Sequence, residues 1–423
     1  MELTIERIDR TTVQVPFRDV PDRNMRRQLP HWQYLDVVEV ELADGTVGYG
    51  EDMIYYGWGT VTDEIMERAR GENAAALLWD DSLGSLQIAL FDAVGRALDV
   101  PVAALVGDPR RDAVPLGWWC IDMPAADWIA ECETAIERGY TAVKLKGRPW
   151  QDVRANVAEL CATVPEWFTV GVDFNTMLLD ADRALPILRD LAEHPQVTVF
   201  ESPIPQGDVA GNRRLARALD ETIAQHSANP DLLTQVQTGI AEGFVLGTGG
   251  PTALGEEAGL AAGADIPFWI QNLGMLTAAF WVHVGSTWAQ NTMPNVLCNH
   301  LFAESLLEEP LTVEDGAVPV PDGPGLGVRP DPDVIARYKV DRPSEQPDPA
   351  RLIVTEWPDH EPVIVARGAQ LDELAKAGDI PYFERGVSTR LVPDDGSAAW
   401  ADLRERAAQE PVVGAQPEVG IDG

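Results

Sequence analysis

The sequence predicts an α/β protein centred on a (β/α)8 barrel, with an α+β domain before the barrel and a short extension after it. Three observations carry this prediction. The chain has 423 residues, too many for one small domain. Its hydrophobic fraction of 45% is enough to fill a large core. From about residue 115, strand-like and helical segments alternate regularly.

Residues 1–113 are expected to form the N-terminal α+β domain. The segment 35–42 is rich in β-branched residues and ends at a turn signal, which predicts a strand. Two helices are predicted within 74–98, the second at 86–98, where hydrophobic residues recur at helical spacing. The segment 16–30 carries several arginines and is expected to be a mobile loop.

Residues 114–312 repeat a strand and a helix about every 25 residues, as a (β/α)8 barrel does. The predicted strands are 115–120, 142–146, 169–173, 198–201, 222–226, 243–247, 267–271 and 295–299. The clearest helices between them are 125–138, 150–162 and 181–193. In such barrels the active site lies at the carboxyl ends of the strands, so the last residues of each strand are the ones to examine.

The chain beyond the barrel is predicted to have two parts. Residues 313–341 are extended and rich in turns, and residues 342–423 form an extension that begins with a proline-rich linker. The extension is expected to contain strands at 351–355 and 362–365, a helix at 370–377 and a disordered end at 412–423.

The composition is strongly acidic, with a formal net charge of −36. Such a surface repels nucleic acid and anionic membranes, so neither is expected as a partner. An anionic substrate is repelled too, unless a cation neutralises the site. The acidic residues are spread along the chain and lysine is scarce, which favours a halophilic protein with a surface adapted to high salt. An acidic bacterial protein without that adaptation is the alternative.

The cysteines and the apolar runs indicate the compartment. The cysteines are widely spaced and form no CxxC motif or Cys/His cluster, which excludes zinc fingers and redox motifs and favours reduced, buried thiols. No apolar segment resembles a secretory signal or reaches membrane-spanning length. We therefore expect a soluble, cytoplasmic protein.

Two of the few lysines, Lys144 and Lys146, stand one residue apart in a predicted strand. Because side chains alternate between the two faces of a strand, both lysines point the same way. Two ammonium groups on one face repel each other, which lowers the pKa of one of them toward neutrality. A neutral lysine is a competent general base. The alternative is a solvated strand end.

Carboxylates end the next two predicted strands. Asp173 ends the third strand and is followed closely by Asn175, and Glu201 ends the fourth. Carboxylate oxygens are hard ligands suited to Mg²⁺. Either acid alone could be a helix cap or a surface group. Both acids at successive strand ends, beside a lysine pair, favour a metal-assisted active site.

With these motifs the chain resembles the enolase superfamily, in its mandelate racemase/muconate lactonizing enzyme branch, over residues 1–341. The motifs that carry the resemblance are Lys144-Leu-Lys146, Asp173-Phe-Asn175, Phe200-Glu201-Ser-Pro203 and Pro324-Gly-Leu-Gly327. The resemblance implies that the N-terminal domain caps the barrel mouth and that the tail packs back on this cap. It also implies a small carboxylate substrate, and we expect a homo-oligomer.

The resemblance implies the chemistry as well: removal of the proton α to a carboxylate with the help of Mg²⁺, giving an enediolate. Lys146 would be the base, and Lys144 would lower its pKa and contact the substrate carboxylate. Asp173 and Glu201 would bind Mg²⁺, with Asn175 nearby. A divalent cation would stabilise the enediolate and offset the negative field of the protein.

The sequence departs from the family pattern at the third metal ligand, which is usually a carboxylate at the end of the fifth strand. That strand ends here in Gln225-His226-Ser227, without an acid. His226 is the best candidate, because a neutral imidazole can bind a metal. Ser227, Asn229 or a water molecule are the alternatives.

The second base of the racemases is also missing. Gln271 and Asn272 follow the seventh strand where a histidine is expected, and the sixth strand lacks the lysine of the lactonizing enzymes. Both residues could instead hydrogen-bond a substrate. The nearest acid candidates are His300 and Glu304. The aromatic residues that could line the pocket are Trp118, Trp119, Tyr55 and Tyr56.

The leading functional hypothesis is a Mg²⁺-dependent lyase that dehydrates a sugar acid or a similar hydroxy-carboxylate. A racemase or epimerase of the same superfamily, with a partner base not identified in the sequence, is the second hypothesis. The third is a degenerate barrel that binds an acid without turning it over. Exchange of the substrate α-proton with solvent separates turnover from simple binding.

The charge excess predicts that stability rises steeply with salt. At about 1 M salt the Debye length is about 3 Å, so repulsion between surface carboxylates is nearly abolished. We expect the melting temperature to climb steadily between low salt and about molar KCl. A melting temperature that stays flat above about 0.1 M would argue for an ordinary acidic protein.

Overall fold

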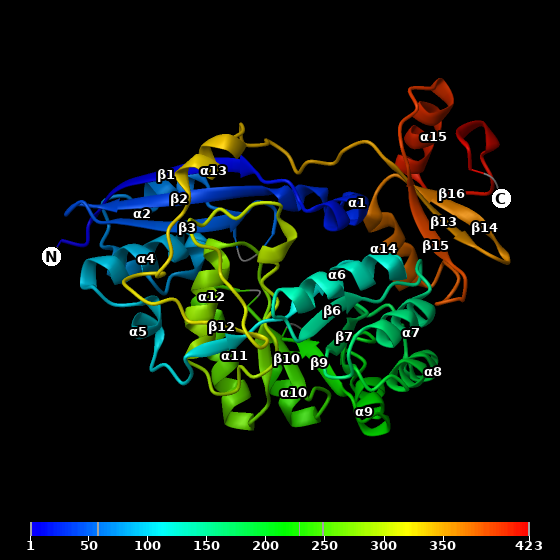
Figure 1. Ribbon diagram of the computed structural model, residues 1–423, viewed down its shortest axis with the longest axis horizontal. Helices are drawn as coiled ribbons and strands as arrows, with labels where there is room; N and C mark the ends of the chain where they lie inside the picture. Colours follow the sequence, from blue (N-terminus) through cyan, green and yellow to red (C-terminus); the bar gives the residue numbers. More distant parts are fainter. Residues whose placement is uncertain (1, 57–58, 228, 248, 422–423) are drawn as a thin grey trace.

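The computed structural model describes residues 2–56, 59–227, 229–247 and 249–421. Along the chain these residues form an N-terminal α+β domain, a barrel of alternating strands and helices, a tail that returns to the first domain, and a C-terminal α/β domain (Figure 1). The barrel and N-terminal domain were predicted. The compact C-terminal domain is more than the short extension expected.

The N-terminal domain is an antiparallel sheet, with strands in the order β1-β2-β3, covered by helix α4. The helix packs so closely on β3 that a side chain at Gly48 would place its Cβ 2.2 Å from the backbone nitrogen of Ala93. The bounds are β1 (Ile5–Gln14), β2 (Tyr34–Leu42), β3 (Val47–Met53), α2 (Asp63–Ala69), α3 (Ala74–Leu77), η2 (Asp81–Leu83), α4 (Leu86–Leu98) and α5 (Val102–Val106). The predicted strand at 35–42 and the helix at 86–98 are confirmed.

The segment 16–30 is not the mobile loop expected from its arginines. It forms helix α1 (Asp19–Gln28), which is followed by the 3-10 turn η1 (Pro30–Gln33). Arg27 of α1 is buried and pairs with buried Asp122 at the barrel mouth. Arg18 and Arg23 likewise pair with Glu131 and Asp127 of the barrel, whereas Arg26 pairs with Asp22 within α1. The pairs with the barrel form only when distant segments meet.

In the described ranges, the barrel sheet contains seven parallel strands in the order β11-β10-β9-β8-β7-β6-β5. The strands are β5 (Trp118–Cys120), β6 (Ala142–Lys146), β7 (Thr169–Asp173), β8 (Val197–Glu201), β9 (Thr222–His226), β10 (Gly243–Leu246) and β11 (Phe268–Ile270). The helices that follow them are α6 (Ala125–Glu137), α7 (Val153–Thr163), α8 (Ala181–Ala192), α9 (Val209–Ala218), α10 (Leu232–Thr238), α11 (Pro251–Ala264) and α12 (Leu276–Ser286). This order agrees with the strand–helix alternation read from the sequence.

Residues 295–296 take the place of the eighth strand. Val296 bridges to Gln271 beside β11, and Asn295 bridges to Leu116 beside β5, both in the parallel sense. The backbone of Val296 also donates to the carbonyl of Ile270 at 2.9 Å. The predicted strand at 295–299 is thus present but short, because the turn η3 (Asn299–Leu301) follows it closely.

The tail packs back on the N-terminal domain. Its elements are β12 (Ala317–Pro319), which pairs with β4 (Ala113–Pro115), and α13 (Pro332–Tyr338). Asp92 of α4 is fully buried and accepts hydrogen bonds from the backbone nitrogens of Leu326, at 2.7 Å, and Tyr49, at 2.8 Å. Arg96 donates to the same carboxylate at 2.8 Å. Asp92 therefore ties the tail, helix α4 and strand β3 together.

The C-terminal domain is an antiparallel sheet, in the order β15-β13-β14-β16, with helices on its two faces. Its elements are β13 (Leu352–Trp357), β14 (His360–Val365), α14 (Gly368–Ala377), β15 (Ser388–Val392), α15 (Ala398–Gln409), β16 (Val412–Val413) and η4 (Pro417–Val419). The predicted strands and helix are present.

The disorder expected from Val412 onward is not found up to Ile421. Strand β16 pairs with β14, and the side chain of Ile421 is fully buried in a small core with Trp400 of α15. Val419 is buried in the same core and Val412 packs against it, so hydrophobic contacts hold this segment in place. Asp422 and Gly423, the rest of that segment, lie outside the described residues.

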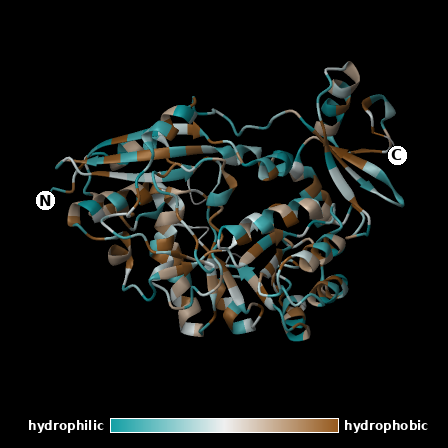
Figure 2. Cartoon of the chain, viewed as in Figure 1, coloured by the Kyte–Doolittle hydropathy of each residue, from teal (hydrophilic) through white to brown (hydrophobic). Residues whose placement is uncertain are grey.

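Hydrophobic positions run along the strands of both the N-terminal and the C-terminal sheets (Figure 2). The N-terminal domain, the barrel and the inner face of the C-terminal domain share one continuous hydrophobic core. The four cysteines, which all lie in the described ranges, are buried and free, as expected. No helix within the described residues is long and apolar enough to cross a membrane.

Replacing Asp92 with alanine is predicted to lower the free energy of unfolding by about 3 kcal/mol or more, because it leaves Arg96 and two backbone donors without their buried partner. Asp402 is the matched control, because it pairs with Arg406 at the same i,i+4 spacing on the exposed surface. Its replacement should change stability by less than about 0.5 kcal/mol. Urea unfolding of both variants is the measurement, and equal losses would contradict the prediction.

Candidate active site

The candidate site is built on the ends of three adjacent strands. Lys146 of β6 is level with Asp173 of β7, and Asp173 is level with Glu201 of β8. Parallel strands in this register bring their last side chains to one edge of the barrel. Lys144 stands two residues earlier on β6, on the same face as Lys146. The predicted grouping of the lysine pair with the two acids is therefore present.

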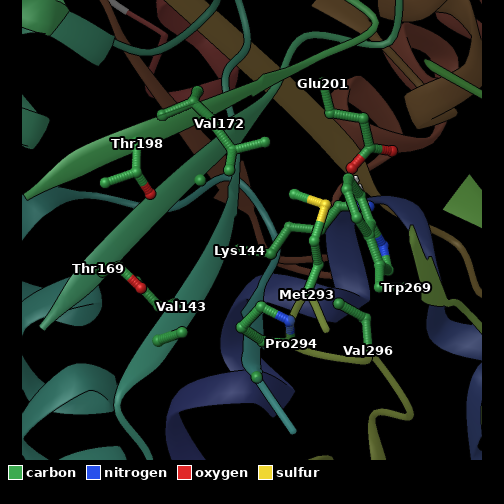
Figure 3. Close-up of a pocket in the computed structure, with 14 residues that line it drawn as sticks. Val143, Lys144, Thr169, Val172, Thr198, Glu201, Trp269, Met293, Pro294 and Val296 are labelled. Carbon is green, nitrogen blue, oxygen red and sulfur yellow. Dashed lines mark ion pairs between the residues drawn. The ribbon is translucent and has the colours of Figure 1, made fainter. Parts of the chain in front are cut away.

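Ion pairs connect the four side chains. The Nζ of Lys146 lies 2.5 Å from Oδ2 of Asp173 and donates to Oδ1 of Asn175 at 3.0 Å. The Nζ of Lys144 pairs with Glu201 and lies 3.6 Å from the same oxygen of Asp173. Figure 3 shows Lys144 and Glu201 beside the ring of Trp269. One lysine ammonium thus stands between two buried carboxylates.

Burial and charge act differently on the two lysines. Burial lowers the pKa of Lys146 from its ordinary 10.5, because its effect outweighs the upward effect of the nearby Asp173 carboxylate. The charge of Lys144 lowers this pKa further. For Lys144, burial also acts downward, but Glu201 and Asp173 outweigh it and the pKa is raised. The pKa of Asp173 stays well below its usual range, because Lys146, Lys144 and Arg148 outweigh its burial. Burial therefore contributes more to the lowered pKa of Lys146 than the repulsion predicted from sequence.

Two cavities adjoin the ion pairs. A small one of about 70 Å³ lies inside the barrel, where Lys144, Glu201, Thr198 and Val172 line it (Figure 3). A larger one of about 330 Å³ lies at the carboxyl ends of the strands and is the candidate substrate site. The larger cavity is lined by Gln28, Leu29, Trp32, Tyr56, Trp119, Ile121, Lys146, Arg148, Asn175, His226, Gln271, Leu273, Val296, Cys298 and Asp372.

Several predicted residues meet in the larger cavity. Gln271 accepts a hydrogen bond from the Lys144 ammonium. The Nε2 of His226 lies 3.0 Å from Oε1 of Glu201, and Asn175 receives the Lys146 hydrogen bond. Gln225, the neighbour of His226, turns the other way and donates to Asn212 of α9. The strand alternation at β9 thus places His226, and not Gln225, at the cavity.

Arg148 is a functional candidate that the sequence analysis missed. It is buried, donates to Asn175 through Nη2, and donates through Nη1 to the backbone carbonyl of Asp173 at 3.0 Å. The signal was present in the sequence, because Lys144, Lys146 and Arg148 are spaced two residues apart. Read as one strand face, this spacing places three cations in line.

The two predicted acid candidates do not reach the larger cavity. His300 is buried with its ring stacked on Trp118, at a centroid distance of 3.9 Å, and its Nε2 donates to the carbonyl of Trp119 at 2.9 Å. Burial and the charge of Arg18 lower its pKa to about 3, so the imidazole is neutral. Glu304 is held on the surface by Tyr338 and Arg337. Both line a separate surface hollow, because the chain turns away immediately after the short eighth strand.

Of the two aromatic pairs predicted to line the pocket, only one member of each does so. Trp118 packs outward on α6, where its indole donates to Glu131 at 3.1 Å, while Trp119 lines the cavity. Tyr55 donates to the carbonyl of Pro343 at 3.2 Å, and the adjacent Tyr56 lines the cavity. In strand β5, adjacent side chains point to opposite faces, which separates Trp118 from Trp119. Tyr55 lies in a turn with a positive φ of 71°, which separates its side chain from that of Tyr56.

Asn272 is likewise absent from the cavity wall. It is buried and its side chain holds the local backbone, donating to Gly247 at 3.2 Å and accepting from Leu273 at 2.9 Å. The cap also contributes Trp32, which the sequence analysis did not assign. Its ring centroid lies 5.5 Å from that of Trp119 and 5.0 Å from that of Tyr56, and the three rings form an aromatic wall. The cavity therefore has a charged floor and an aromatic side.

The two carboxylates fit a Mg²⁺ ion. Proteins commonly hold Mg²⁺ by one or two carboxylates, and water and substrate oxygens complete its shell. Asp173 and Glu201 are buried, and their oxygens converge on one cation, here the Lys144 ammonium. Among the described residues, no three His, Cys, Asp or Glu side chains gather closely enough to hold a metal. His226 therefore contacts Glu201 without forming the predicted three-ligand site.

Known proteins resemble both the sequence and the fold. The family described as "Enolase C-terminal domain-like" matches residues 127–334. Muconate cycloisomerase 1-1 of Acinetobacter lwoffii is 28% identical over 376 residues, which are 80% of this chain and 97% of the relative. The 3,6-anhydro-alpha-L-galactonate cycloisomerase of Streptomyces coelicolor is 28% identical over 69% of this chain and 80% of its own length. An N-succinylamino acid racemase from an Amycolatopsis species is 28% identical over 60% of this chain and 70% of its own length.

A solved structure shows the same fold. The muconate lactonizing enzyme from Pseudomonas putida superposes with a TM-score of 0.67 at 25% identity, covering 80% of this chain and 100% of that one. The family match, the relatives and the shared fold agree with the motifs at the strand ends. The chain belongs to the enolase superfamily, in its mandelate racemase/muconate lactonizing enzyme branch.

Proposed function

We propose that this protein is an enzyme that removes the proton α to the carboxylate of a small organic acid, with Lys146 as the base. The placement of Lys146 carries the proposal. It is the one lysine among the described residues that line the larger cavity, and Asp173 and Asn175 fix its ammonium group. A general base has to lie within hydrogen-bond reach of the proton it removes. The relatives named cycloisomerase and racemase support this reading.

The neighbouring guanidinium of Arg148 would bind and orient the substrate carboxylate. Arg148 lines the cavity beside Lys146, and Asn175 accepts a hydrogen bond from each of them. This positive cluster offsets the repulsion that the net charge of −36 imposes on an anion. The aromatic wall of the cap excludes water, which strengthens these charge interactions.

In the proposed site, Asp173 and Glu201 would hold Mg²⁺, and His226 would steady Glu201 through its ring nitrogen. When bound, the ion supplies positive charge that stabilises the enediolate formed when the α-proton leaves. The same carboxylate oxygens are held by Lys144 and Lys146 in this structure. Metal and lysines therefore compete for these oxygens, and metal binding would free the Lys146 ammonium from Asp173.

Isomerisation is the reaction class we favour. Lys146 takes the α-proton, and the electron pair left on the α-carbon forms a double bond to the β-carbon as a β-oxygen departs. If that oxygen stays tethered within the molecule, the product is a ring-opened isomer, and the reverse reaction closes the ring. This sequence needs one base, in agreement with the single lysine on the cavity wall and with the relatives named cycloisomerase.

Dehydration of a hydroxy-carboxylate is the second candidate. The same proton removal expels a free β-hydroxyl, which leaves as water after it takes up a proton. The polar lining by Asn175, Gln271 and Asp372 favours this candidate, because such groups hydrogen-bond hydroxyls. Racemisation would require a second base on the opposite face of the substrate, and His300 and Glu304 lie outside the cavity.

Replacing Lys146 with alanine is predicted to lower exchange of the substrate α-proton by at least about a hundredfold, because the general base is lost. Exchange is measured by proton NMR in D₂O with Mg²⁺ and a library of lactones, sugar acids and N-acylated amino acids. Lys339 is exposed on the tail, so its replacement by alanine should leave exchange unchanged. Full exchange in the Lys146 variant would contradict the base assignment, and absence of exchange in the unmodified protein would favour an acid-binding barrel.

Asp173→Asn and Glu201→Gln are each predicted to lose most Mg²⁺ binding, measured by calorimetry with the metal alone. His226→Ala should weaken binding by about tenfold, because it removes the partner of a ligating carboxylate. Glu193→Gln makes the same charge change on an exposed residue and should have no effect. Wild-type affinity in the Asp173 variant would refute the metal site, and wild-type affinity in the His226 variant would leave this histidine a structural role.

A further inference from the structure

The C-terminal domain is fixed against the mouth of the barrel. Helix α14 contacts α1, and in Figure 1 it lies between the C-terminal sheet and the barrel. Three hydrogen bonds link the domain to loops that follow β6 and β7: Thr389 to the carbonyl of Trp150 at 2.7 Å, the backbone of Gly386 to Asp152 at 2.8 Å, and Tyr382 to the carbonyl of Leu178 at 2.9 Å. These are the strands that carry Lys146 and Asp173.

Hydrophobic packing makes the attachment firm. Leu371 and Ala375 of α14 belong to the core shared with the barrel, and the ring of Phe383 lies 5.8 Å from that of Phe174, which follows β7. The opposite face of the domain has a separate small core around Trp400 of α15. The domain is therefore an integral wall of the barrel mouth rather than a tethered appendage.

Helix α14 places one carboxylate in the larger cavity. Asp372 lines it together with Lys146 and Arg148, and Gln28 of α1 lies 3.5 Å away from its Oδ1. Burial raises the pKa of Asp372, and the charges of Arg148 and Lys376 only partly offset that effect. The next residue, Glu373, is exposed on the far side of the same helix. Asp372 is thus an incompletely paired acceptor that faces the space for a substrate.

We propose that the C-terminal domain supplies Asp372 as the group that selects the substrate. The Asp372 carboxylate accepts hydrogen bonds from hydroxyl or ammonium groups on the part of the substrate that lies away from its reacting carboxylate. Asp372 also repels a second substrate carboxylate at that position. This inference rests on the proposed function, because it assumes that the substrate carboxylate binds beside Lys146. It names the substrate class as a hydroxylated or aminated monocarboxylate.

Charge and hydrogen-bond capacity support the assignment. An ionised carboxylate is an acceptor only, so it pairs with donors and repels another carboxylate placed against it. Lys146 at the end of β6 and Arg148 just after it lie on the floor of the cavity, whereas Asp372 enters from α14 on the wall. The matches to relatives span nearly all of those proteins but about 80% of this chain. A selecting group on the C-terminal domain would distinguish this protein from them.

The test uses the full-length Mg²⁺-loaded protein and two six-carbon probes, D-gluconate and adipate, with dissociation constants from calorimetry. D-Gluconate has one carboxylate and several hydroxyls, and adipate has two carboxylates and no hydroxyl. The unmodified protein should bind D-gluconate more tightly than adipate. Asp372→Asn should weaken D-gluconate at least about tenfold, as expected for loss of hydrogen bonds to a charged group, and should tighten adipate. Glu373→Gln, the same charge change on the exposed side of α14, should alter neither.

The inference is overturned if the unmodified protein prefers adipate or binds neither probe. It is also overturned if the Asp372→Asn variant binds both probes with unchanged affinities. A change of the same size in Glu373→Gln overturns it too, because the effect would then come from the general field of the helix. Failure of the proposed function is distinguishable. In that case α-proton exchange is absent while the Asp372-dependent preference in binding persists. If instead only the inference fails, exchange remains and the preference does not depend on Asp372.

Discussion

The candidate site depends on one interaction, the placement of the Lys144 ammonium between the carboxylates of Glu201 and Asp173. Two buried acids on adjacent strands would repel each other in a low-dielectric interior, and a cation between them removes that cost. The parallel register sets this arrangement, because it ends β6, β7 and β8 at one level. In a chain with a net charge of −36, local neutralisation of this kind is what allows an anion to approach.

The rest of the structure encloses that charged floor. Helix α1 contributes Gln28 at the rim and is held on the barrel by the buried pair of Arg27 and Asp122. The cap adds an aromatic wall, and the C-terminal domain adds Asp372. Each part reaches the cavity from a different region of the sequence. Enclosure reduces the amount of water at the floor of the cavity. Electrostatic interactions there are therefore stronger than they would be at the surface.

The same geometry accommodates two reaction outcomes. In the proposed reaction, removal of an α-proton by Lys146 leaves an electron pair that expels an oxygen from the β-carbon, and the product depends on whether that oxygen is tethered. In this proposal the floor of the cavity carries out the first step, and the walls select the acid. Under this proposal, one kind of cavity floor combined with different walls accounts for relatives that are named cycloisomerase and racemase.

The sequence alone predicted the barrel and the grouping of two lysines with two carboxylates at the ends of adjacent strands. These features are local: strands and helices have their own periodicities, and alternation along β6 places Lys144 and Lys146 on one face whatever else the chain does. The acids Asp173 and Glu201 follow from the same rule. Helix α4 and the C-terminal strands were predicted for this reason as well.

Only the tertiary structure decided which distant segments meet at the cavity. Helix α1 was predicted as a loop because the sequence does not show that Arg23 and Arg27 have carboxylate partners on the barrel. His300, a candidate acid in the sequence, is a neutral ring stacked on Trp118. Asp372 lies more than two hundred residues from Lys146 in sequence, yet both line one cavity. No local pattern encodes such a meeting. The proximity of these residues results from the packing of whole domains, which determines both which side chains are buried and which long-range ion pairs form.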